Sequence, residues 1–177
     1  RLMGYAALLK AGDYELTYNT SPWQLLERVT TGVVNQSEVR FIEGWTFSQL
    51  RSTLNEHPAV RHDTAGLSDL EIMRLIGAGE TAAEGLFFPD TYYFVRGNSD
   101  ITILKRAYRA MQNNLATAWA GRAMNLPLTD AYQALILASI IEKETGREGD
   151  RSNIAGVFVN RLRLDMRLQT DPTVIYG

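Results

Sequence analysis

The sequence contains no cysteine and only two histidines, and these absences exclude several classes of site. Without cysteine, the chain has no disulfides, no thiolate nucleophile and no cysteine metal site. The histidines, His57 and His62, lie in the polar segment NEHPAVRHD, outside any nucleophile motif, so no Ser-His-Asp triad is expected. There is also no HExxH motif or Cys/His cluster. We therefore expect no metal and no other cofactor, and activity should survive EDTA.

Neither sign of charge is in excess, because 18 Lys and Arg residues against 20 Asp and Glu residues give a net charge of −2. Nucleic-acid surfaces need clustered basic residues, so we expect no nucleic-acid partner. No apolar run reaches the roughly 18–20 residues of a membrane-spanning helix, and no signal peptide is visible. The chain begins at RLMGYAALLKAG and stops at DPTVIYG, directly after a strand-like pattern. We therefore expect further sequence beyond both ends.

Hydrophobic periodicity predicts helices and isolated strands without a regular βαβ alternation, which favours an α+β fold. Strand patterns cover 37–44 and 84–97, the second broken by Pro89. Ser68 and Glu71 fit a capping box at the start of one helix. The expected N-caps of three other helices are Ser21, Asp100 and Asp130, and Asp100 begins the longest of them. The predicted helices cover residues 22–31, 46–54, 67–79, 100–119, 130–144 and 151–163, and in the third of them Leu70, Met73 and Ile76 share the apolar face.

The segment ILASIIEKETG, residues 136–146, ends an almost entirely apolar helix with two carboxylates, Glu142 and Glu144. A helix that is apolar all round is expected to be buried. Consecutive residues turn by about 100°, so these two side chains point about 200° apart and cannot share a face. The helix C-terminus and apolar neighbours disfavour an ionised carboxyl group, as a general acid near neutral pH requires. The alternative is that the helix end emerges into solvent and both are ordinary surface residues.

The next predicted helix carries polar groups on and beside its apolar stripe of Ile154, Val157, Phe158 and Leu162. Arg161 falls within the stripe and therefore needs an anionic partner, either from the preceding helix or from a bound substrate, and Asn160 flanks it. The segment RLQTDPTVIYG follows, in which Gln169, Thr170, Asp171 and Thr173 surround Pro172. This segment is either a plain turn or a row of hydroxyl, amide and carboxylate groups suited to sugars.

Two long motifs, LASIIEKET and IAGVFVNRLRLDMRLQTDPTVIYG, closely resemble the MltG (YceG-like) family of endolytic murein transglycosylases. EGLFFPDTYYF and ILKRAYRAM are similar to that family in the same order, and AGDYELTYNTSPWQLLERVTTG resembles its LysM-like subdomain. The resemblance covers nearly the whole chain. It implies a partial LysM-like subdomain at 1–36 and a YceG-like catalytic domain at 37–177 whose C-terminal part is missing.

The resemblance implies cleavage of the β-1,4 bond between N-acetylmuramic acid and N-acetylglucosamine in peptidoglycan, leaving a 1,6-anhydromuramic end. The essential acid of the family is the second glutamate of EKE, which corresponds to Glu144, whereas Glu142 is expected to be structural. The substrate-binding candidates are Asn160, Arg161, Gln169, Thr170, Asp171 and Thr173.

The same resemblance implies a single-pass anchor in the bacterial inner membrane, with the catalytic domain in the periplasm or outside the cell. The expected partners are peptidoglycan glycan strands and proteins of cell-wall synthesis and elongation. Two alternatives remain open: a non-catalytic peptidoglycan-binding module, and a hydrolytic muramidase.

Overall fold

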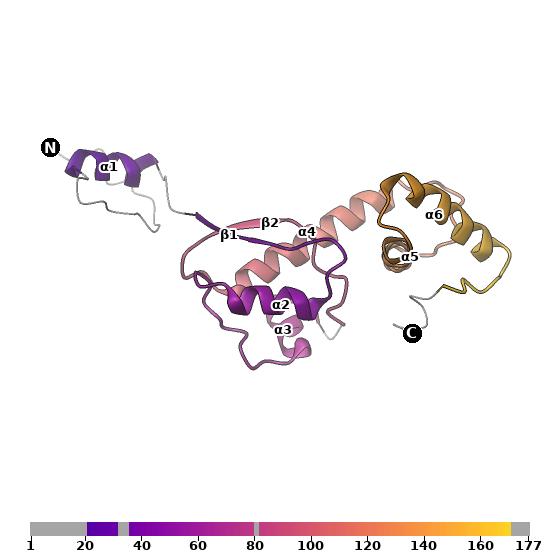
Figure 1. The fold of residues 1–177 in the computed structure, drawn as a ribbon, viewed down its shortest axis with the longest axis horizontal. Helices are drawn as coiled ribbons and strands as arrows, with labels where there is room; N and C mark the ends of the chain where they lie inside the picture. Colours follow the sequence, from indigo (N-terminus) through magenta and orange to yellow (C-terminus); the bar gives the residue numbers. More distant parts are fainter. Residues whose placement is uncertain (1–20, 32–35, 80–81, 171–177) are drawn as a thin grey trace.

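The computed structural model describes residues 21–31, 36–79 and 82–170 (Figure 1). The mixture of helices with a small sheet confirms the predicted mixed fold. None of the described helices combines the length and apolar character that a bilayer crossing requires. The elements in chain order are α1 (Pro22–Thr31), β1 (Gln36–Arg40), α2 (Phe47–Glu56), α3 (Asp69–Ile76), β2 (Thr91–Val95), α4 (Asp100–Ala120), α5 (Ala131–Glu144) and α6 (Glu148–Arg163).

The expected LysM-like subdomain at 1–36 falls mostly outside the described residues and stays a prediction. Its described part is α1, which begins at Pro22 as the sequence predicts. The Ser21 hydroxyl accepts a hydrogen bond from the Gln24 amide at 3.3 Å, so Ser21 acts as the expected N-cap.

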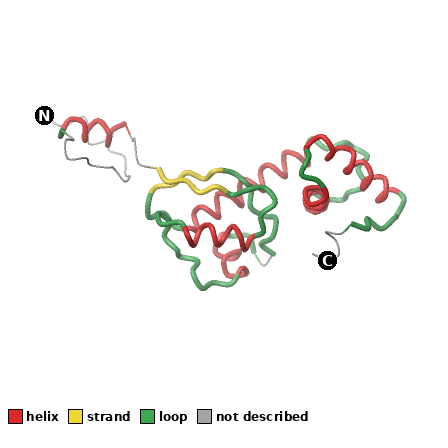
Figure 2. Tube along the Cα trace, in the orientation of Figure 1, coloured by secondary structure: helices red, strands yellow, loops and turns green. Residues whose placement is uncertain are grey.

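Strands β1 and β2 form a two-stranded antiparallel sheet, drawn in yellow in Figure 2. Val39 lies opposite Tyr92, and Glu38 lies opposite Tyr93. Because strand side chains alternate between faces, Val39 and Tyr92 are buried while Glu38 and Tyr93 face solvent. Both strands are shorter than predicted: β1 ends at Arg40 although the pattern extended to residue 44, and β2 covers only Thr91–Val95 of the predicted 84–97, after the break at Pro89.

Helices α2 and α3 each begin with a capping box, formed by Thr46 with Gln49 and by Ser68 with Glu71. The second of these confirms the sequence prediction. The predicted apolar face of α3 is partly wrong, because Leu70 is 49% exposed and Ile72 is fully buried in its place. Helix α3 is apolar on more than one arc, and its packing against α4 selects the arc that is buried.

The N-cap of helix α4 lies one residue earlier than the sequence predicts. Its N-cap is Ser99, whose hydroxyl accepts from the Ile101 amide at 3.2 Å. Asp100 is fully buried, and its carboxylate accepts a 2.8 Å hydrogen bond from the Ile101 amide as well as bonds from the Thr64 hydroxyl at 2.6 Å and the Thr64 amide at 3.0 Å. This carboxylate therefore ties the loop before α3 to the start of α4, a contact that local sequence does not reveal.

Two hydrophobic clusters lie at opposite ends of α4. The larger one joins the sheet, α2, α3 and the first half of α4, where Ile103 and Leu104 are fully buried. The smaller one joins α5 and α6 through Leu137, Ile140 and Phe158. Figure 1 shows α4 leading from the sheet to the α5–α6 pair, so this helix connects the two clusters.

Candidate functional site

Helix α5 begins and ends where local signals predict. The Asp130 carboxylate accepts from the Gln133 amide at 2.8 Å, and this bond is the main cause that lowers the pKa of Asp130. The helix ends at Glu144 because Thr145 adopts an extended conformation. Residues 145–147 then form a short connection to α6, which packs against α5. Glu144 is thus the last helical residue, next to the segment that turns back.

The expectation of a fully buried α5 is wrong. Leu137 and Ile140 are buried against α6, but Tyr132 and Ile136 are 56% and 46% exposed. The exposed face lines a cavity, so this side of the helix is not covered. Glu144 is also exposed, and Glu142 is half-buried. The apolar composition of α5 therefore reflects one packed face and one cavity wall.

The structure brings Glu144 together with Thr170, a substrate-binding candidate in the segment that follows α6. The Thr170 hydroxyl donates a hydrogen bond to Oε1 of Glu144, although the two residues are 26 positions apart. Thr170 is buried, with 7% of its surface exposed, whereas Glu144 is open to solvent. One carboxylate oxygen is therefore held by the protein, while Oε2 has no hydrogen-bonding partner among the described residues.

Arg161 does not pair with Glu144, which was one of the partners that the sequence allowed. Its Nη1 donates a hydrogen bond to the carbonyl oxygen of Leu168, two residues before Thr170. Arg161 is half-buried, so a carbonyl oxygen satisfies part of its hydrogen-bonding capacity there. Between these positions Gln169 has a φ of 52°, a left-handed conformation that is uncommon for a residue other than glycine. Arg161 and this turn together direct Thr170 towards Glu144.

Asn160 and Gln169 are both exposed. The Asn160 side-chain oxygen accepts a 3.3 Å hydrogen bond from Arg163, whose other terminal nitrogen lies 3.3 Å from the carbonyl oxygen of Asn125. Asn160 is therefore held in place through Arg163 and the loop before α5. The remaining candidates, Asp171 and Thr173, lie outside the described residues.

Glu142 points to a different partner from Glu144. Its Oε2 forms a 2.9 Å ion pair with Nη2 of Arg151 on α6. This ion pair links α5 to α6 and supports the expected structural role of Glu142. The Nε of Arg151 is buried without a hydrogen-bond partner, which leaves this guanidinium only partly satisfied.

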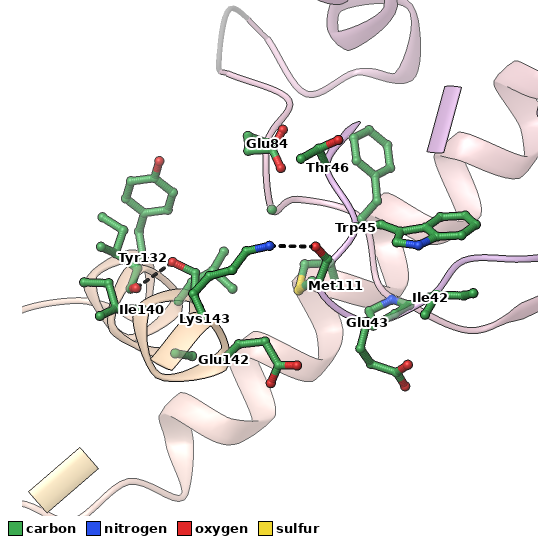
Figure 3. A pocket seen from close by; sticks show the side chains of 18 residues that line it. Ile42, Glu43, Trp45, Thr46, Glu84, Met111, Tyr132, Ile140, Glu142 and Lys143 are labelled. Atoms are coloured by element: carbon green, nitrogen blue, oxygen red, sulfur yellow. Dashed lines mark hydrogen bonds between the residues drawn. The ribbon is translucent and has the colours of Figure 1, made fainter. Parts of the chain in front are cut away.

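A cavity of about 610 Å³ lies between α5 and the turn that joins β1 to α2 (Figure 3). Trp45, Glu84 and Tyr132 are among the residues that line it, but Glu144 is not. Lys143 crosses from α5 to the opposite wall, where its Nζ donates a 3.0 Å hydrogen bond to the Gly44 carbonyl oxygen. The sequence did not predict this cavity or the Lys143–Gly44 hydrogen bond, because the two residues are 99 positions apart and no local motif connects them.

The site thus offers one solvent-facing carboxyl group with one oxygen held by a buried hydroxyl. A carboxyl group in this arrangement is suited to proton transfer, because its second oxygen is accessible to a bound substrate. Over the described ranges, no three or more Asp, Glu and His side chains gather in a way that would hold a metal ion.

Comparison with known proteins adds independent information. A protein from Bacillus subtilis (strain 168) named endolytic murein transglycosylase is 41% identical over 96 residues, which are 53% of this chain and 26% of that protein. A protein of the same name from Streptococcus pneumoniae serotype 2 (strain D39 / NCTC 7466) is 27% identical over 96% of this chain and 35% of its own length. The chain therefore spans about a quarter to a third of these curated relatives.

A crystal structure of a yceG-like protein from Listeria monocytogenes has a similar fold. It matches 96% of this chain and 61% of its own chain, with a TM-score of 0.62 and 28% sequence identity. The model of the YceG-like family matches residues 1–177. Fold similarity, sequence similarity and the family model agree over nearly the same residues, and the chain belongs to the YceG-like family.

Proposed function

We propose that this chain is part of a peptidoglycan lytic transglycosylase and that Glu144 is its general acid and base. The observation that carries the proposal is the hydrogen bond from the buried Thr170 hydroxyl to the exposed Glu144 carboxylate. The names of the two similar bacterial proteins, both endolytic murein transglycosylases, support the same activity and the same substrate class.

The reaction follows from one carboxyl group that gives up a proton and later takes one back. Protonated Glu144 donates its proton to the glycosidic oxygen between N-acetylmuramic acid and N-acetylglucosamine as the C1–O bond breaks. The 6-hydroxyl of the muramic acid residue then attacks C1, and its proton passes to the Glu144 carboxylate. A 1,6-anhydro ring forms, the acid is regenerated and no water is consumed. Thr170 holds Oε1 throughout, which leaves Oε2 to exchange the proton.

A second protein carboxylate is not needed in this mechanism, because the substrate itself supplies the nucleophile. Paired-carboxylate glycosidases instead place two carboxyl groups on either side of the scissile bond. Glu142 is not suited to that role, since it points away from Glu144 and is paired with Arg151. Asn160, Arg161, Gln169, Thr170, Asp171 and Thr173 are proposed to contribute to substrate binding, with Arg161 acting through the Leu168 carbonyl.

The two alternative functions differ from the proposed one in what they release from peptidoglycan. A hydrolytic muramidase would add water at C1 and leave a reducing muramic acid end, one water heavier than the anhydro sugar. A non-catalytic module would bind glycan strands and release nothing. Mass spectrometry of the soluble products from isolated cell-wall sacculi separates all three activities.

The decisive variant is Glu144→Gln in the full-length protein, with Glu142→Gln as its matched control two residues away. We expect release of anhydromuropeptides by the wild type and the Glu142→Gln control, and none by Glu144→Gln. Unchanged release by Glu144→Gln would show that another group performs the proton transfer.

The location and partners are part of the same proposal. An enzyme acting on peptidoglycan works in the cell envelope, which fits a single-pass anchor in the inner membrane and a catalytic domain in the periplasm or outside the cell. We propose glycan strands as its substrate, a LysM-like subdomain at 1–36 as an additional contact to them, and proteins of cell-wall synthesis as partners.

A further inference from the structure

The last turn of α5 is attached to three different parts of the molecule by three consecutive side chains. Glu142 pairs with Arg151 of α6, Lys143 bonds to the Gly44 carbonyl, and Glu144 accepts from Thr170. Because each residue turns by about 100°, these attachments spread over about 200° of the helix circumference. Attachments on several sides resist both rotation and fraying of the turn that carries Glu144.

We propose that Lys143 is a positioning residue that fixes the orientation of Glu144 by attaching α5 to the β1–α2 turn. This inference rests on the proposed function of Glu144. The Lys143 bond is the one hydrogen bond that the described residues show between α5 and this turn. In Figure 3 the Lys143 side chain extends across the cavity to the dashed line that marks the bond.

The end of α5 needs such an attachment because helix ends lack their usual hydrogen bonds and fray. Thr145 is already extended, although its amide still donates to Ile141 at 3.2 Å. The other two attachments, to Arg151 and Thr170, both come from α6 or the segment after it. Among the described residues, Lys143 makes the one hydrogen bond that joins the last turn of α5 to the segment between Phe41 and Phe47, two members of the larger hydrophobic cluster.

The acceptor is also built for this contact. Gly44 has a φ of 75°, in the left-handed region that other residues adopt with strain. An added Cβ would meet nothing within 4 Å, so Gly44→Ala would change the backbone conformation without a steric clash. The glycine therefore sets the direction of the carbonyl that Lys143 binds.

The bond is exposed, so its contribution to overall stability is expected to be small. Its effect is expected on catalysis, because a small misplacement of a catalytic group lowers turnover strongly. In the full-length protein, Lys143→Met keeps a side chain of similar length and removes the donor. We expect kcat to fall about tenfold with KM changed by less than about twofold. Lys143→Arg keeps a donor and should recover most of the lost turnover.

Lys105→Met is the matched control, since Lys105 is a lysine on α4 with no hydrogen bond to any described residue. It should leave kcat unchanged, and the melting temperatures of all three variants should agree with that of the wild type. Gly44→Ala should lower kcat like Lys143→Met, and the double variant should be no worse than either single variant. Turnover of Lys143→Met equal to that of Lys105→Met would overturn the proposal, as would a fall that Lys143→Arg does not recover.

Hydrogen exchange tests the attachment without any activity. In Lys143→Met the amides of residues 143–145 should exchange faster, while those of residues 134–138 keep their wild-type rates. Unchanged exchange at 143–145 would overturn the attachment itself, whether or not Glu144 is the catalytic acid. If Glu144→Gln retains activity while the amides of residues 143–145 still exchange faster in Lys143→Met, the proposed function fails and the attachment stands.

Discussion

Oε2 of Glu142 lies 2.9 Å from Nη2 of Arg151, so the first glutamate of the EKE segment holds α5 and α6 together. Its neighbour by two positions, Glu144, forms no ion pair among the described residues and faces solvent beside Thr170. These two chemically identical side chains therefore have different surroundings because the helix directs them to different sides.

Removing the Glu142–Arg151 ion pair should have a small effect. Both side chains are about one-third exposed or more, and ion pairs of this kind contribute about 0.2–1 kcal/mol. We expect Glu142→Gln to lower the free energy of unfolding by less than about 1 kcal/mol, measured by urea denaturation. The charge-swapped pair Glu142→Arg with Arg151→Glu should recover part of this loss. A loss of several kcal/mol would contradict the peripheral role of the pair.

Removing the Thr170 hydroxyl should impair turnover more than binding. In Thr170→Val the side chain keeps its shape, but Oε1 of Glu144 loses its donor and the carboxyl group is free to rotate. We expect kcat on isolated sacculi to fall about tenfold. Thr170→Ser keeps the hydroxyl and serves as the control, with at most about a threefold fall. Equal activities of the two variants would show that the hydroxyl does not act on Glu144.

Asp100 should be the most sensitive carboxylate for folding. It is fully buried and accepts hydrogen bonds from the amides of Asp63 and Thr64 and from the Thr64 hydroxyl. Asp100→Ala leaves these donors without an acceptor, which we expect to lower the free energy of unfolding by about 3 kcal/mol. Glu56→Ala, at an exposed position on α2, should change it by less than about 0.5 kcal/mol. Similar losses in both variants would contradict this assignment.

Acid should weaken the start of α5 before it affects the rest of that helix. Hydrogen bonds from the Gln133 amide and the Thr129 hydroxyl lower the pKa of Asp130 in the folded state. The unfolded chain therefore binds the proton more readily, so this contribution is complete above about pH 4 and is lost as the pH falls further. Asp130→Asn keeps an N-cap that does not titrate. Urea denaturation of both proteins between pH 5 and about pH 2 should show a shallower pH dependence for Asp130→Asn.

Local signals predicted the elements well because they depend on residues close together in the sequence. The Ser68–Glu71 capping box, the Asp130 N-cap and the break at Pro89 all concern groups a few positions apart. Ambiguity arose where a helix is apolar on more than one arc, as in α3, where packing buries Ile72 and leaves Leu70 exposed. Periodicity alone does not decide between such arcs.

The site contacts depend on pairings that no local pattern encodes. Thr170 reaches Glu144 across 26 residues, and Lys143 reaches Gly44 across 99 residues. Asp100 was expected to cap its own helix, but its carboxylate also accepts a hydrogen bond from the Thr64 amide, in a loop 36 positions earlier. In each case the residue type and its polarity were visible in the sequence, whereas the partner was determined by how the helices pack.

The unequal sizes of the two hydrophobic clusters have a consequence for heat inactivation. Helices α5 and α6 pack together through three buried side chains, Leu137, Ile140 and Phe158, whereas the sheet and α2–α4 share a much larger cluster. A segment with fewer buried apolar contacts opens at a lower free-energy cost than the whole domain. Warming should therefore separate Glu144 from Thr170 while the sheet is still folded, and activity should disappear below the temperature at which the protein as a whole melts.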